Sequence, residues 1–193
     1  AILLLIFGKM SLFASLLIIF SIMAAFNLIN LQDVKRELDL NMIAILVFSL
    51  AIGQAIIKTG TGNILATYLI QILQPFGMLA ILIGLLLVTT ILTSFITNIG
   101  AISITFPLAY AIAQNLNVDG SPFYLGIAYA ASAAFLTPIG YQTNLIIYGP
   151  GGYTFRDFFR IGLPVTLIYL TVVTIMLMLL YQNIFVEEIL SFL

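Results

Sequence analysis

The chain has 193 residues, of which 63% are hydrophobic and 7% are charged, and its net charge is −1. A soluble domain needs a polar surface and does not have this composition, so the solvent of this chain is a lipid bilayer. The small net charge predicts no nucleic-acid partner. The chain contains no Cys and no His, which excludes disulfides, thiolate nucleophiles, imidazole bases and the usual transition-metal sites.

The N-terminal part predicts the end of one membrane span followed by a complete second span. The chain begins with Ala1 inside an apolar run over residues 1–7, and no basic region precedes this run, so it is not a secretory signal. We interpret the chain as a fragment of a longer protein. The apolar residues 10–31 are enough to cross a bilayer core of about 30 Å at about 1.5 Å per helical residue.

A polar linker and two apolar runs follow. Residues 32–40 are the charge-rich segment of the chain and predict a cytoplasmic loop. Residues 41–58 predict the next span, which ends at the glycine-containing segment 59–62. The run over residues 63–74 is shorter and carries one Asn and two Gln residues, which favours an interfacial or connecting helix over a span.

Residues 76–115 are almost continuously apolar, and a polar segment that contains Gly100 interrupts them at residues 93–100. This pattern predicts a turn at membrane depth, formed by a re-entrant hairpin or by two full spans. Both arrangements return the chain to the side it left. We expect the hydroxyls of Thr93 and Thr97 to bond to the carbonyl one turn back. Asn98 needs more partners, because a primary amide in hydrocarbon must satisfy several donor and acceptor positions.

Residues 123–148 predict a broken helix. Small residues dominate the run over 123–136, and the polar segment 137–144 interrupts it. Pro138 lacks a backbone N–H and Gly140 weakens the helix, so the freed backbone groups must line a cavity, bind a ligand or bond to neighbouring helices. Two polar, glycine-containing breaks in adjacent apolar segments are typical of a secondary-transporter site at the bilayer midplane.

The C-terminal part predicts an interfacial helix and a final span. Residues 149–152 are glycine-rich but lack the Gly-Lys-Ser/Thr ending of a phosphate loop, so we do not expect nucleotide binding. Residues 154–160 predict an amphipathic interfacial helix, and residues 161–184 predict the last span. Lys35, Arg36, Arg156 and Arg160 fall on one side in this topology. The positive-inside rule makes that side cytoplasmic and places residues 117–119 and the C-terminus outside.

The segment 132–153, SAAFLTPIGYQTNLIIYGPGGY, is followed by FRDF at 155–158 and GLP at 162–164. This segment resembles the C-terminal half of the divalent anion:sodium symporter family within the ion transporter superfamily, and most closely its sulfate-permease-like branch. The resemblance implies an all-α integral membrane fold in which residues 1–193 form one of two inverted repeats, with a re-entrant hairpin and a discontinuous helix. It also implies a missing N-terminal half of the same protein and a homodimer.

The resemblance also implies a site at the two breaks. In the family, Ser-Asn-Thr motifs at the hairpin tips contact sodium and the substrate anion, and Thr97-Asn98-Ile99 stands at that position here, with Ile99 lacking the final hydroxyl. The implied substrate-binding residues are Thr97, Asn98, Ile99, Tyr141, Gln142, Thr143 and Asn144. The implied sodium ligands are Thr93, Ile96, Asn98 and Gly140, with Ile96 and Gly140 acting through the backbone.

The chemistry of the residues agrees with sodium coupling. Sodium is a hard cation that carbonyl, hydroxyl and amide oxygens serve, whereas the chain has no His and no carboxylate at membrane depth to relay protons. We therefore expect sodium-coupled symport of a divalent anion, sulfate or a dicarboxylate, by alternating access in the cell (inner) membrane. The alternatives are citrate, arsenite or sodium/proton transport within the same superfamily, or an anion channel. An intramembrane enzyme would need Ser with His, paired Asp or zinc, so we do not expect an enzyme.

Overall fold

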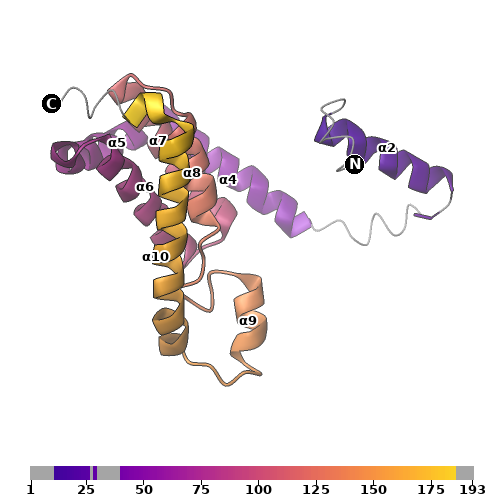
Figure 1. The fold of residues 1–193 in the computed structure, drawn as a ribbon. Helices are drawn as coiled ribbons and strands as arrows, with labels where there is room; N and C mark the ends of the chain where they lie inside the picture. The colour runs from indigo at the N-terminus through magenta and orange to yellow at the C-terminus, as the bar shows by residue number, and fades with distance from the viewer. Residues whose placement is uncertain (1–10, 27, 30–39, 186–193) are drawn as a thin grey trace. The chain divides into compact units, whose positions relative to one another are not determined.

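The computed structural model describes residues 11–26, 28–29 and 40–185, and Figure 1 shows the fold. The described residues form α-helices and one short 3-10 turn, without a β-strand among them. The chain divides into two compact units, residues 1–44 and 45–193, which are described separately. The predicted cytoplasmic loop at 32–40 lies outside the described residues except for Leu40, as do the apolar run at 1–7 and the C-terminal end.

The first unit contains helix α2 (Leu12–Ala25). Its N-cap is Ser11, whose hydroxyl accepts a hydrogen bond from the N–H of Ala14 at 3.2 Å. The helix is shorter than the predicted span at 10–31, because the N-cap sets its start at Leu12 and the cap residue Phe26 follows its end.

Helices α4 (Leu40–Lys58) and α5 (Thr61–Leu73) follow, and the 3-10 turn η1 (Gln74–Phe76) continues α5. The two helices are bent by 70° at their junction. Gly60 has a φ of 73°, a left-handed conformation that glycine adopts without steric cost, and this residue makes the bend. Residues 61–73 therefore run in a new direction as a separate helix.

The remaining helices are α6 (Met78–Thr93), α7 (Asn98–Leu116), α8 (Ser121–Ala131), α9 (Gln142–Tyr148) and α10 (Phe155–Leu180). Residues 94–97 interrupt the helical structure between α6 and α7, and residues 132–141 interrupt it between α8 and α9. The first interruption falls within the polar segment 93–100, whereas the second begins five residues before the polar segment 137–144 and ends within it.

Helix α10 differs from the prediction of an interfacial helix at 154–160 and a span at 161–184. One continuous helix runs from Phe155 to Leu180, without an interruption between the two predicted segments. It starts early because Thr154 and Asp157 form a reciprocal capping box, in which the carboxylate accepts from the N–H of Thr154 at 2.8 Å. The continuous helix places the basic residues Arg156 and Arg160 in its first turns.

The core of the second unit lies among α5, α6, α7, α8 and α10, which cluster together in Figure 1. Leu82 and Leu85 of α6 and Phe123 of α8 are completely buried in it. Outside this core the surface is apolar, and Ile161 and Ile168 of α10 are each 65% exposed. Such a surface suits lipid or another apolar partner rather than water.

Among the described residues, Asn98–Leu116 and Phe155–Leu180 are long and apolar enough to cross a membrane. The bent pair Ile43–Lys58 and Thr61–Phe76 adds a third span if both helices belong to one crossing. The predicted all-α integral membrane fold is confirmed.

Glycine allows α10 to pack directly against the second break. A Cβ atom at Gly162 would lie 2.1 Å from the carbonyl oxygen of Phe135, a distance at which the backbone must move. We therefore expect Gly162→Ala to lower the thermal stability of the purified protein markedly, since overpacking a buried contact costs about 1–3 kcal/mol.

Gly149→Ala is the matched control, because Gly149 has a helical φ of −70° and nothing lies within 4 Å of a Cβ atom there. The control is expected to keep the wild-type melting temperature. Equal melting temperatures for the two variants would contradict the close packing at Gly162.

Candidate functional site

The turn between α6 and α7 forms the first side of the candidate site. Thr97 is the N-cap of α7, and its hydroxyl accepts a hydrogen bond from the N–H of Gly100 at 3.2 Å. This contact replaces the expected bond of Thr97 to the carbonyl one turn back, because the backbone is extended at Thr97 and the residue caps the following helix. Asn98 is therefore the first residue of α7 and stands directly at the break.

Thr93 links this turn to the second break. Its hydroxyl is buried and lies 2.7 Å from the carbonyl oxygen of Ala131 and 2.9 Å from Oδ1 of Asn98. The expected bond to the carbonyl one turn back is therefore wrong for Thr93. The reason is that α8 ends at Ala131, so the carbonyl of Ala131 has no helical N–H partner and accepts from the Thr93 hydroxyl of α6 instead. Thr90 makes a similar contact with the carbonyl of Ala130 at 3.4 Å.

Thr137 joins the two breaks a second time. Its buried hydroxyl donates to the carbonyl oxygen of Ser94 at the end of α6 and accepts from the N–H of Gly140 at 3.1 Å. This hydroxyl thus acts as a donor to the first break and as an acceptor from the second.

Asn144 satisfies backbone groups that the break around Pro138 releases. Its amide Nδ2 donates to the carbonyl oxygens of Ala134 at 3.0 Å and of Thr137 at 3.1 Å. The sequence left open whether neighbouring helices, a cavity or a ligand would satisfy these groups. The described structure satisfies these two carbonyls with a side chain of the same segment.

The structure brings together three of the predicted sodium ligands. Thr93 and Asn98 are hydrogen-bonded, and a Cβ atom at Gly140 would lie 3.1 Å from the carbonyl oxygen of Thr93. A hydroxyl carries one proton, so Thr93 donates to only one of its two neighbouring oxygens at a time. Uncharged oxygens therefore converge at this point, which is the donor set that a hard monovalent cation prefers. Ile96 lies in the same turn, and its side chain is 36% exposed.

A polar cavity of about 310 Å³ lies beside this cluster. Its lining residues are Asn98, Ser132, Ala134, Phe135, Tyr141, Thr143 and Asn144. The cavity thus collects Asn98, Tyr141, Thr143 and Asn144 of the predicted substrate-binding set. The other three predicted residues, Thr97, Ile99 and Gln142, do not line it.

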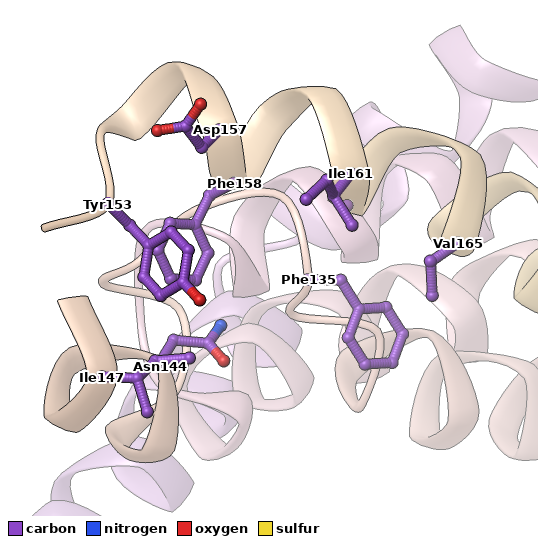
Figure 2. A pocket seen from close by; sticks show the side chains of 9 residues that line it. Phe135, Asn144, Ile147, Tyr153, Asp157, Phe158, Ile161 and Val165 are labelled. Carbon is purple, nitrogen blue, oxygen red and sulfur yellow. The ribbon is translucent and has the colours of Figure 1, made fainter. Parts of the chain in front are cut away.

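A second cavity of about 300 Å³ adjoins the first and shares Phe135 and Asn144 with it. Figure 2 shows its side chains, with Asn144 and Ile147 on the α9 side and Val165 on the α10 side. Its lining is mainly apolar. The ring of Phe135 also contacts Tyr169 of α10 edge-on, with 5.9 Å between ring centroids.

Sequence reasoning missed Ser132, Ala134 and Phe135 as cavity residues, and it missed the contacts of Thr90 and Thr137. Ser132 and Ala134 belong to the small-residue run that suggested helix packing, whereas the helix ends at Ala131 and exposes them to the cavity. The sequence feature that could have predicted the contact between the two breaks was the polar Thr137 next to the helix-breaking Pro138.

The polar cavity has no charged lining residue in the described part of the chain. The described residues also contain no group of three or more His, Cys, Asp or Glu side chains that could hold a metal ion. Asp119 lies in the loop after α7, where hydrogen bonds from the N–H and hydroxyl of Ser121 lower its pKa. The described residues that line the polar cavity therefore supply neutral polar groups, without an Arg or Lys among them.

The comparison with protein families decides the class of this chain. The family model described as "Citrate transporter" (CitMHS) matches residues 2–190. The chain belongs to the citrate transporter family. Membership agrees with the predicted resemblance to divalent anion:sodium symporters, and it confirms the prediction of a transport protein rather than an enzyme.

Several relatives of this chain are named as transporters. The uncharacterized transporter sll0640 of Synechocystis is 36% identical over 141 residues, which are 73% of this chain and 23% of that protein. The uncharacterized transporter YfbS of Escherichia coli is 30% identical over 160 residues, which are 83% of this chain and 26% of that protein. Sodium/sulfate cotransporter 1 of Chlamydomonas reinhardtii is 28% identical over 136 residues, which are 70% of this chain and 15% of that protein. The chain thus spans about a quarter or less of these relatives.

The hydrogen bonds of Asn144 lead to a stability prediction. We expect Asn144→Asp to lower the melting temperature, because an ionised carboxylate has no N–H to donate and faces two carbonyl oxygens. A buried group left without a partner costs about 1–3 kcal/mol. Gln142→Glu makes the same chemical change at an exposed side chain in the first turn of α9 and is expected to leave the melting temperature unchanged. Equal destabilisation by both changes would contradict the role of Asn144.

Proposed function

We propose that the full-length protein carrying this chain is a secondary active transporter that couples sodium to the symport of a divalent anion, sulfate or a dicarboxylate. The observation that carries the proposal is the meeting of two helix breaks, where buried uncharged oxygens converge beside a polar cavity. Discontinuous helices that meet in this way are the usual construction of ion and substrate sites in secondary transporters.

Thr93, Asn98 and Gly140 support the sodium part of the proposal. Thr93 Oγ1 and Asn98 Oδ1 lie 2.9 Å apart, and Gly140 packs against the carbonyl of Thr93. The partial negative charge at the C-terminal end of α6 favours a cation at the same place. Ile96 is the fourth proposed ligand, through its backbone oxygen. Sodium/sulfate cotransporter 1 is named for the same coupling ion.

The polar cavity supports the anion part of the proposal. Asn98, Tyr141 and Thr143 contribute amide and hydroxyl groups to its lining, and α7 begins at Asn98 with N–H groups that favour an anion. A sodium ion at Thr93 and Asn98 would supply the positive charge that the lining lacks. Thr97, Ile99, Gln142 and Asn144 complete the proposed substrate-binding set.

The short helix α6 supports a re-entrant hairpin over 76–115. Its 16 residues span about 24 Å at about 1.5 Å per residue, less than a bilayer core of about 30 Å. The end of α6 is buried, since Thr93 and Ser94 are at most 1% exposed and contact the second break. Alternating access would follow from movement of this hairpin and the broken helix against the flanking spans.

Citrate is the second candidate substrate. The family is described as a citrate transporter family, and a cavity of about 310 Å³ falls within the range of about 300–1,000 Å³ that organic ligands occupy. The same cavity also accepts the smaller sulfate ion, so uptake of both must be compared.

The decisive experiment measures uptake of labelled sulfate, succinate and citrate into vesicles that contain the full-length protein, with and without an inward sodium gradient. We expect sodium-driven uptake of one divalent anion, and we expect Asn98→Ala to abolish it because the change removes an oxygen from both the ion cluster and the cavity.

Asn63→Ala is the matched control, since its amide pairs with Asn115 at the opposite end of α7 and is exposed. Its uptake should equal that of the wild type. Sodium-independent flux, or an Asn98→Ala variant as active as wild type, would contradict the proposed site and favour a channel or another transport mode.

The proposed topology places the protein in the cell (inner) membrane as a homodimer, with the other inverted repeat supplied by an N-terminal half. In this topology Asp119 and the C-terminus face outward, and Arg156 faces the cytoplasm.

Cysteine labelling tests this orientation. In a background without other cysteines, Asp119→Cys is expected to react with a membrane-impermeant thiol reagent added to intact cells. Arg156→Cys is expected to react only after permeabilisation, because the basic residues at the start of α10 lie on the cytoplasmic side. The reverse labelling pattern would show that the topology is inverted.

A further inference from the structure

Thr137 occupies the junction of the two breaks without lining the polar cavity. Its side chain is 2% exposed, and it is absent from the residues that surround the cavity. Thr137 lies in the non-helical break at 132–141, and its hydroxyl donates to the carbonyl of Ser94, which is 43 positions away in the sequence.

The contacts of Thr137 extend in both directions. On one side, Ser94 directly follows Thr93, whose hydroxyl approaches Asn98. On the other side, the Thr137 hydroxyl accepts from the N–H of Gly140, and the Thr137 carbonyl accepts from the amide of Asn144. Asn144 lines the polar cavity. A continuous set of hydrogen bonds and adjacent residues thus leads from the oxygen cluster, through Thr137, to the cavity.

We propose that Thr137 is a positioning residue that couples sodium binding at Thr93 and Asn98 to anion affinity in the cavity, an inference that rests on the proposed function. An ion drawn to the cluster fixes the end of α6. The Ser94 carbonyl then orients the Thr137 hydroxyl, which accepts from the N–H of Gly140. The backbone carbonyl of Thr137 in turn accepts from the amide of Asn144 and positions it. Without the hydroxyl, the two breaks still pack against each other, but the hydrogen bond that couples their positions is lost.

Coupling of this kind is reciprocal. If sodium tightens anion binding by some factor, the anion must tighten sodium binding by the same factor, because both describe one thermodynamic cycle. A loss of this shared factor differs from a general loss of stability, which weakens binding of each ligand without a matched change in their interaction.

The test measures binding to the full-length protein by calorimetry, with sulfate or succinate as the anion, whichever the uptake assay identifies. The anion Kd is determined at low and saturating sodium, and the sodium Kd at low and saturating anion. For Thr137→Val, which keeps the side-chain shape without the hydroxyl, we expect the coupling factor to fall about fivefold or more in both directions. Thr137→Ser keeps the hydroxyl and is expected to retain the wild-type factor.

Thr89→Val is the matched control. The Thr89 hydroxyl is also completely buried, but it donates to the carbonyl of Leu85 at 2.8 Å within its own helix. The wild-type coupling factor is expected for this variant. An unchanged factor in Thr137→Val, or an equal loss in Thr89→Val, overturns the inference while leaving sodium-coupled transport intact. Absence of any sodium effect in the wild type overturns the proposed function and this inference together.

If Thr137→Val does not fold, Thr137→Cys replaces it, because a thiol is a weaker hydrogen-bond donor of similar size. Its coupling factor is expected to lie below that of the wild type. A full wild-type factor in Thr137→Cys overturns the inference.

Discussion

The structure depends on one constraint, the need to satisfy backbone groups that the helices leave unpaired inside a lipid-facing protein. In hydrocarbon, each N–H or C=O group without a partner costs several kcal/mol, so a broken helix must find partners close by. The breaks at 94–97 and 132–141 find them in each other. Thr93 and Thr90 donate to the carbonyls at the end of α8, and Thr137 donates to the carbonyl of Ser94.

This mutual satisfaction explains why the polar residues of the two breaks gather at one place. A break that bonds to a second break must lie against it, and glycine permits the contact. Gly140 packs against the carbonyl of Thr93, and Gly162 of α10 packs against the carbonyl of Phe135. The cluster of uncharged oxygens and the polar cavity are thus consequences of the same packing. In the proposed function, dipoles would hold the cation and the anion there without the cost of burying a charged side chain.

A similar relation holds at Pro107 within α7. Proline has no N–H, so the carbonyl of Ser103 loses its helical partner. Gly53 of α4 packs against this carbonyl, and a Cβ atom placed at Gly53 would lie 3.2 Å from its oxygen. At the two breaks and at Pro107, a helix end or a proline leaves a carbonyl without its helical partner. A hydroxyl donates to the carbonyl at the breaks, and a glycine packs against it at Pro107. Breaks in helices therefore contribute to the packing of this unit beside its apolar side chains.

The sequence by itself determined the lipid environment, the all-α class, and the two breaks at which Asn98 and Asn144 lie, because hydropathy, proline and glycine act locally along the chain. Only the tertiary structure decided which breaks meet. The hydroxyl of Thr93 donates to the carbonyl of Ala131, and the hydroxyl of Thr137 donates to the carbonyl of Ser94. These acceptors are 38 and 43 positions away from their donors, so no local pattern encodes them. The cap at Thr97 and the capping box at Thr154 join residues three positions apart and are local interactions.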